Sequence, residues 1–340
     1  MPKAVDLLQD LVNIPAPPGQ EGELAQIVCD KVRAIGFEPS IDAKGNVVVA
    51  VGPVGDPKVV VTAHLDELAL MVTAILRDGS LLVTNLGGVQ PWKWGETPVE
   101  IMANEPIPGI LSFGSVHTES RESTIVQGKS RPIEWNQTSV FTGRTPEAIA
   151  KMGVRPGTRI AMARSRRAMT KIGEYIGGYF LDDRADLAAW LLLLRRLKEA
   201  PPSIPILFAA TVCEEVGGHG ALYVLQGTRP EFCVALELGP VVPDSPVELS
   251  AIPTVWAHDS FAATDSRDLD ILANLGQEVQ FQVLSRGGSD ASCAASNGLC
   301  ARPVTLGIPM ENTHGYEIIH RHGIDRLVDL TVAYLSAIAA

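Results

Sequence analysis

The chain has 340 residues, of which 46% are hydrophobic and 20% are charged, and its formal net charge is −11. This composition is typical of a globular protein with a sizeable core. The acidic balance argues against nucleic acid or an anionic membrane as a partner, because both attract clustered Lys and Arg. The one basic cluster, at residues 164–167, is predicted to be a solvated loop.

Three features of the sequence predict a cytoplasmic protein. No apolar run reaches the roughly 18 residues of a membrane span, and residues 1–10 lack the apolar stretch of a signal peptide. The cysteines form no CxxC pair, which favours buried, reduced thiols over a disulfide framework or a thiolate zinc site. These five cysteines are Cys29, Cys213, Cys233, Cys293 and Cys300.

The N-terminal part of the chain has α/β texture. Apolar residues at helical spacing predict helices at 3–13 and at about 21–35, the second ending at Gly36. Two β-branched runs, at 46–51 and 58–62, predict strands. The second run is almost continuously apolar, which is typical of an interior strand in a sheet that is covered on both faces.

The middle of the chain, residues 72–168, differs from both ends. Its segments are short, alternating and rich in Gly, Pro and Thr, with no helix beyond a turn near 146–152, which predicts a small β-barrel or sandwich. We therefore predict a discontinuous α/β domain, residues 1–71 and 169–340, interrupted by an inserted β domain. After the insertion, the predicted elements are helices at about 183–198, after 217, 289–297 and 323–338, and strands at 204–212, 232–238, 278–284 and 301–306.

Polar side chains follow the predicted strands at the points where these end. His64 follows the strand at 58–62, and Asp66 comes two residues later on the same face. Strand ends at the edge of an open α/β sheet are where sites form. His64 could bind a metal through one ring nitrogen while Asp66 accepts the other ring N–H. By itself, this pattern is equally compatible with a structural histidine.

Two pairs of adjacent carboxylates occupy similar places. Asp182 and Asp183 precede an apolar helix, where they are either capping groups or ligands that bridge two cations. Glu214 and Glu215 directly follow the strand at 204–212. Because burying two like charges side by side is costly without cations, one is predicted to bind metal and the other to act as general base on a metal-bound water. A solvated strand end is the alternative.

Two further residues complete the set at strand ends. Glu237 closes the strand at 232–238, and His314 follows the strand at 301–306. Two imidazoles and three carboxylates suit a pair of borderline cations such as zinc, cobalt or manganese, with an Asp shared between the two ions. The predicted metal ligands are His64, Asp182, Glu215, Glu237 and His314.

Candidate substrate contacts come from two other segments. A histidine in the inserted domain is predicted to reach the site from a lid or from a neighbouring subunit. The segment 285–290 is predicted to form a tight, substrate-facing loop, and it is no phosphate-binding loop because the Gly-x4-Gly-Lys pattern is absent. The candidates are His117, Gly287, Gly288, Ser289 and Asp290.

Five segments together resemble the glutamyl aminopeptidase family of di-zinc metallopeptidases, which includes the tetrahedral aminopeptidases and the proteins once called cellulase M. They are AHLDE at 63–67, LDDR at 181–184, EEVGGHGA at 214–221, GGSDA at 287–291 and PMENTHGYE at 309–317. The resemblance covers essentially the whole chain. It implies a mixed-sheet, three-layer, phosphorylase/hydrolase-like catalytic domain with an inserted β-barrel for dimerisation. It also implies a peptide substrate and a homo-oligomer, often a dodecamer built from dimers.

The resemblance also assigns the metal ligands. It implies that Asp182 bridges two zinc ions, with His64 on one ion and His314 on the other. Glu215 and Glu237 would each add one carboxylate.

The remaining roles follow from the same resemblance. Glu214 would be the general base that takes a proton from the water between the metals, and Asp66 would orient His64. A cis peptide bond is implied between Asp182 and Asp183.

The chain departs from the family pattern at two places. The family usually has Asp where this chain has Glu237, and a Tyr-x-His-Ser-type segment where this chain has residues 312–315. In related di-zinc hydrolases the choice of Glu accompanies substrates other than free N-termini. The sequence therefore predicts amide hydrolysis, by an aminopeptidase or by a deacylase or amidase acting on an N-blocked small peptide. A non-catalytic metal-binding scaffold is the alternative from a different class.

Overall fold

The computed structural model describes residues 4–340. Its first elements are α1 (Ala4–Val12) and α2 (Gly22–Ile35), where the apolar spacing predicts helices, although residue 3 lies outside the described residues. Gly36 ends α2 with a φ of 98°. Glycine adopts this left-handed conformation without strain, so the predicted cap is confirmed.

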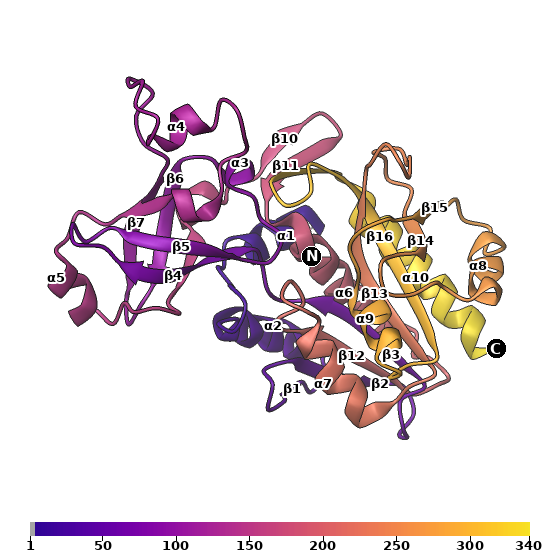
Figure 1. Ribbon diagram of the computed structural model, residues 1–340. Coiled ribbons are helices and arrows are strands. Elements are labelled where there is room, and N and C mark those ends of the chain that lie inside the picture. The colour runs from indigo at the N-terminus through magenta and orange to yellow at the C-terminus, as the bar shows by residue number, and fades with distance from the viewer. Residues whose placement is uncertain (1–3) are drawn as a thin grey trace.

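A large mixed sheet forms the α/β domain (Figure 1). Its centre consists of four parallel strands in the order β12 (Ile206–Thr211), β3 (Val59–His64), β13 (Phe232–Pro240) and β16 (Arg302–Glu311). β2 (Val47–Val51) pairs antiparallel with β12 on the outer side. Because parallel strands end at one edge of a sheet, the polar residues at the ends of these strands are brought together there.

Helices cover both faces of this sheet and make a three-layer structure. α6 (Leu181–Glu199) and α10 (Gly323–Ala339) pack with α1 and α2 on one face, and α7 (His219–Thr228) and α9 (Asp290–Ser296) pack on the other. All six residues of β3 are buried, as expected for a strand with helices on both sides.

The inserted segment folds into a closed β-barrel beside the α/β domain, with strand order β4-β5-β8-β7-β6-β9 (Figure 1). Its interior is filled by Leu, Val and Ile side chains together with Trp94 and Trp135. The proposed domain boundaries at residues 72 and 168 stay a prediction. The barrel strands are β4 (Ala69–Ile75), β5 (Leu81–Leu86), β6 (Thr97–Met102), β7 (Pro106–Ser112), β8 (Ser139–Phe141) and β9 (Arg159–Met162).

The structure contains elements that the sequence does not predict. One is β14, which is held by pairing with β15 and β16 rather than by its own sequence pattern. The expectation of no helix in the insertion beyond the turn near 146–152 is wrong, because two further one-turn helices occur there. The unpredicted elements are β10 (Thr170–Ile172), β11 (Tyr175–Tyr179), β14 (Thr254–His258), β17 (Tyr316–His320), α3 (Pro91–Trp94), α4 (Thr124–Gln127) and α8 (Ser266–Ala273).

The predicted fold class, an α/β domain with a mixed sheet and an inserted small β-barrel, is confirmed. Across residues 4–340, the structure has no helix that combines the length and the apolar character needed to cross a membrane. The remaining elements are β1 (Ser40–Ile41), α5 (Pro146–Lys151), β15 (Gln280–Val283) and two short 3₁₀ turns at Trp135–Gln137 and Arg164–Arg166.

Candidate metal centre

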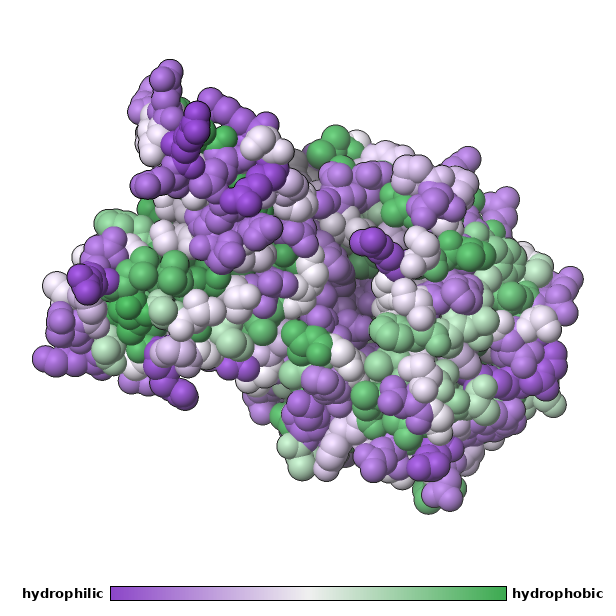
Figure 2. Space-filling model, viewed as in Figure 1, coloured by the Kyte–Doolittle hydropathy of each residue, from purple (hydrophilic) through white to green (hydrophobic). Residues whose placement is uncertain are grey.

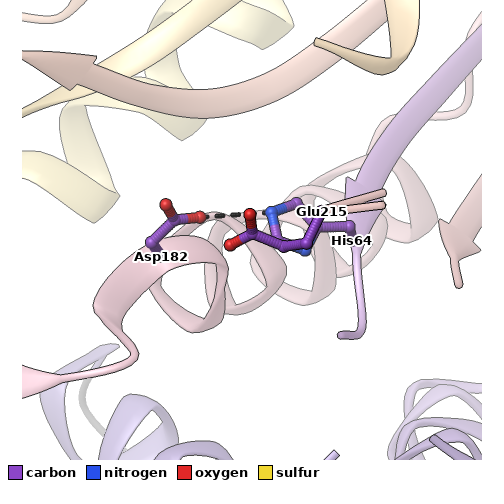
Figure 3. A group of neighbouring side chains, drawn as sticks. All are labelled: His64, Asp182 and Glu215. Carbon is purple, nitrogen blue, oxygen red and sulfur yellow. Dashed lines mark hydrogen bonds and ion pairs between the residues drawn. The ribbon is translucent and has the colours of Figure 1, made fainter. Parts of the chain in front are cut away.

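The five predicted metal ligands meet at the carboxyl edge of the central strands. Figure 3 shows three of them converging, His64 from the end of β3, Asp182 from the start of α6 and Glu215 from the loop after β12. The candidate ligand atoms of these three residues all lie within 4.8 Å of one another. The same holds for the group His64, Glu214 and Glu237.

His64 is buried and is held from three sides. Its Nε2 lies 3.1 Å from Asp182 Oδ1, and its backbone N–H donates to Asp183 Oδ2 at 2.7 Å. Its Nδ1 lies 3.0 Å from the backbone carbonyl oxygen of Asp66 and 3.6 Å from the Asp66 carboxylate. A proton on Nδ1 therefore leaves Nε2 free as a metal ligand that faces Asp182.

Asp182 is positioned by its backbone as well as by His64. The peptide bond between Asp182 and Asp183 is cis, as the resemblance implies. The Asp182 N–H donates to Glu317 Oε2 at 3.1 Å, and the Asp182 Oδ2 lies 3.6 Å from His314 Nε2. The two oxygens of Asp182 thus face one histidine each, which is the arrangement a bridging carboxylate requires.

Asp66 holds the backbone of the two adjacent glutamates. Its Oδ1 accepts from the N–H of Glu214 at 2.9 Å, and its Oδ2 accepts from the N–H of Glu215 at 3.1 Å. The preceding residue, Cys213, has a φ of 56°, which turns the chain sharply after β12. This turn aims both glutamate side chains at the same edge.

Glu237 lies inside β13 and points to the same place. Its Oε1 lies 3.7 Å from His64 Nε2. Its Oε2 accepts from the backbone N–H of the next residue, Leu238, at 2.7 Å. The Glu237 side chain, which is one methylene longer than that of Asp, is thus folded back on its own strand, and one oxygen remains directed at His64.

His314 completes the set from the loop between β16 and β17. Its φ is 63°, and its N–H donates to Glu317 Oε1 at 2.9 Å. A loop from the barrel lies against its ring, because a Cβ added at Gly88 would be 2.8 Å from Cε1 and Nδ1. The barrel therefore forms part of the wall of the candidate centre.

The electrostatics of the cluster fit a bound cation. Burial raises the pKa of Glu214, Glu215 and Glu237 well above the usual value, and neighbouring carboxylates raise it further. Within the described chain, the buried Oε1 of Glu215 has no hydrogen-bond partner. A divalent ion would offset the cost of burying these carboxylates, because it stabilises the charged form of each. The nitrogen and oxygen donors fit borderline metals such as zinc.

A cavity of about 870 Å³ opens from this cluster. Figure 2 shows the molecule hollowed between the barrel and the α/β domain, with hydrophilic residues in the hollow. Gly287, Gly288 and Ser289 line the cavity. Asp290 lies beneath it, where it accepts from Thr211 Oγ1 at 2.6 Å. His117 is exposed in a barrel loop and is not among the cavity's lining residues, so a role from a neighbouring subunit stays a prediction.

The structure adds one residue to the sequence analysis and corrects two of its expectations. Glu317, in a quoted motif but without a role, uses both oxygens to hold the backbones of Asp182 and His314. The prediction that residues 164–167 form a solvated loop is wrong for Arg167, which is fully buried and paired with Glu67. Only the fold brings this arginine and its partner together. The cysteines also differ from the prediction of five buried thiols, because Cys293 and Cys300 are partly exposed.

The chain is similar to known proteins over nearly its whole length. Residues 45–330 match the model of the M42 glutamyl aminopeptidase family. A lysyl aminopeptidase from Pyrococcus furiosus is 28% identical over 347 residues, covering 97% of this chain and 96% of the relative. Aminopeptidase APDkam598 from Desulfurococcus kamchatkensis superposes with a TM-score of 0.85 at 23% identity, covering 98% of this chain and 94% of that one. Pyrococcus horikoshii TET1 peptidase, which can assemble into a tetrahedron or a large octahedral shell, gives 0.84 at 23%, covering 98% and 99%.

Proposed function

This chain belongs to the M42 glutamyl aminopeptidase family of metal-dependent peptidases, and we propose that it removes N-terminal residues from short peptides with two zinc ions. The observation that carries this proposal is the convergence of two imidazoles and three carboxylates around one bridging aspartate. His64 and His314 lie on opposite oxygens of Asp182, at 3.1 and 3.6 Å.

We assign three ligands to each ion. His64, Asp182 and Glu237 would hold one, and Asp182, Glu215 and His314 would hold the other. When bound, the ions supply Lewis acidity that polarises the scissile carbonyl and acidifies the attacking water. The unpartnered Oε1 of Glu215 supports this assignment, because a buried carboxylate oxygen needs a hydrogen-bond donor or a cation.

Glu214 is the proposed general base. Its N–H is fixed by Asp66, and its carboxylate lines the cavity beside the proposed ligands. It accepts a proton from the attacking water as the new C–O bond forms. It then gives this proton to the leaving nitrogen as the C–N bond breaks.

Six apolar side chains line the cavity, together with the charged Asp244 and Arg286. Among the apolar ones, Trp256 is almost completely buried, whereas Phe261 is half exposed. This apolar surface supports an apolar side chain on the N-terminal residue of the substrate. The apolar lining residues are Leu238, Pro240, Val242, Trp256, Phe261 and Leu284.

Because Glu237 stands where the family usually has Asp, the experiment tests whether the substrate must have a free N-terminus. Leucyl and N-acetyl-leucyl p-nitroanilides are compared on protein purified without chelator, with metal content measured by mass spectrometry. About two zinc ions per chain and cleavage of the free substrate alone are expected. Cleavage of the blocked substrate alone would make the chain a deacylase or amidase. A chain that takes up no metal even after zinc is added would contradict the metal assignment.

We also propose that the chain forms a homo-oligomer through its barrel, as a dodecamer built from dimers. Ile110 on β7 and Phe141 on β8 are directly paired neighbours, and both are at least 50% exposed. The tetrahedral assembly of the Pyrococcus horikoshii relative supports this proposal. Light scattering on the purified protein measures the subunit count, and a monomer at micromolar concentration would contradict it.

A further inference from the structure

The two segments that connect the barrel to the α/β domain meet at one buried ion cluster. The first connection runs from His64 at the end of β3 to Ala69 at the start of β4, and it contains Glu67. The second runs from the end of β9 to β10, and it contains Arg167. Both side chains are 0% exposed, so the cluster lies inside the junction.

The Glu67 carboxylate binds two arginines at once. Arg167 pairs with both of its oxygens, one of them at 2.9 Å from Nη1. Arg184 Nη2 donates to Glu67 Oε2 at 2.8 Å, and Arg184 is also 0% exposed. Charge-assisted bonds of this kind are directional, so they fix the angles between the three segments as well as their distances.

The remaining donors of the arginines reach the backbone of both domains. Arg167 donates to the carbonyls of Val12 at 3.0 Å and Met162 at 3.2 Å, which belong to α1 and to the last barrel strand. Its guanidinium also lies 4.5 Å from the centre of the Phe180 ring, two residues before Asp182. Arg167 thus ties the barrel to the segment that carries a proposed metal ligand.

Arg184 connects the cluster to His64. It donates to the carbonyls of Leu65 at 2.6 Å and Asp66 at 3.2 Å. The same Asp66 carbonyl is the nearest partner of His64 Nδ1, at 3.0 Å. Glu67 therefore acts on the ligand through two links, since it orients Arg184, and Arg184 orients the carbonyl that sets the histidine.

The barrel also touches the centre directly. A Cβ at Gly87 would lie 3.1 Å from Glu215 Oε2, and a Cβ at Gly88 would lie 2.8 Å from the ring of His314. A small rotation of the barrel at its two connections would move this loop relative to both ligands. The orientation that the cluster fixes is therefore one to which the centre is sensitive.

We propose that Glu67 is a positioning residue whose pairing with Arg167 and Arg184 couples the orientation of the barrel to the geometry of the metal centre. This inference rests on the proposed metal-dependent site. A buried ion cluster is weak as a source of stability but well suited to fixing one arrangement of several segments. The cluster would then make the correct seating of the barrel a condition for full metal affinity.

The test replaces Glu67 without changing its size. In Glu67→Gln, zinc affinity is measured by competition with a chelator, and kcat and KM are measured separately on the folded, zinc-saturated protein. We expect zinc affinity and kcat to fall about 10- to 100-fold, as when groups that orient metal ligands are removed, with KM changed less. A purely structural role would lower the melting temperature of the variant and leave both quantities unchanged.

Two further variants make the result decisive. Arg167→Lys keeps the positive charge and removes the bidentate contact with Glu67. We expect it to fold more readily than Glu67→Gln and to show smaller losses of zinc affinity and kcat. Glu23→Gln removes an exposed pair with Arg164 at the same junction and should change nothing. Zinc affinity and kcat within twofold of the parent in Arg167→Lys would overturn the proposal. Because zinc affinity is read without substrate, inactivity of the parent on peptides would count against the proposed function alone.

Discussion

The barrel and the α/β domain bury different kinds of polar group. Between residues 72 and 162, the buried polar side chains are hydroxyls, those of Ser80, Thr97, Thr138, Thr142 and Thr158. The α/β domain buries ionisable side chains, among them His64, Asp182, Glu237 and Glu317. Hydroxyls are inexpensive to bury, whereas buried carboxylates demand partners. The barrel thus buries few groups that need a charged partner, whereas the carboxyl edge of the large sheet buries many.

The largest expected effect is a loss of kcat from a substitution at the carboxyl edge of the large sheet. In Glu214→Gln we expect kcat to fall by about 10²- to 10⁴-fold, because the proposed proton acceptor is lost, while zinc affinity stays unchanged. Glu199→Gln, at the exposed end of α6, is the matched control. A parallel loss of zinc would instead identify Glu214 as a ligand, and near-normal turnover would remove it from the mechanism.

A substitution in the barrel core should instead lower stability and leave zinc affinity unchanged. Ile101 is completely buried among the apolar residues of the barrel. Ile101→Ala should lower the free energy of unfolding by about 2–5 kcal/mol, because it leaves a cavity. Denaturant unfolding measures this loss, and zinc affinity of the folded protein at low temperature should stay at the parental value. A matching loss of zinc affinity would show that the two regions are less separate than their interiors indicate.

A substitution at one barrel position, Gly88, should lower zinc affinity. The Cβ introduced by Gly88→Ala would lie 2.8 Å from the His314 ring and force it to move. We expect zinc affinity to fall about 10-fold, the lower end of the range for disturbed metal ligands. Gly227→Ala, at an exposed helical position with open space around it, is the control. Unchanged zinc affinity in Gly88→Ala would mean that the loop yields instead of the histidine.

The smallest effect concerns the metal-free protein. Burial raises the pKa of Asp186 to about 7 and that of Glu317 to about 8. The folded state therefore binds more protons than the unfolded state between roughly pH 4 and these values, and stability is lost as pH rises through them. The melting temperature of chelator-treated protein should fall by about 5 °C between pH 5.5 and 8.5.

Zinc should reverse this trend, because metal binding needs deprotonated ligands. Amide exchange locates the effect, which should be confined to the edge of the large sheet and leave barrel amides unchanged. A melting temperature of the metal-free protein that is constant or rises with pH would contradict the burial argument.

The same contrast explains what the sequence could predict. Most candidate ligands could be located because they lie at the ends of apolar strands, and parallel strands must end at one edge, whereas Asp182 could be located by its place before an apolar helix. The roles of Glu317 and Glu67 could not be found, since each depends on partners far away in the chain that only the fold brings close. Arg167 has the same sequence context as exposed Arg164 and Arg166, and no local pattern separates them. Likewise, β14 and β17 are stabilised by pairing with distant strands.

The order of the proposed ligands along the chain bears on synthesis at the ribosome. A growing polypeptide presents His64 and the barrel first, then Asp182, Glu215 and Glu237, and His314 only between β16 and β17 near the end. Because domains fold as they emerge, the barrel can form long before the last ligand has been made. A growing chain in which His314 has not yet been made therefore lacks one of the proposed ligands.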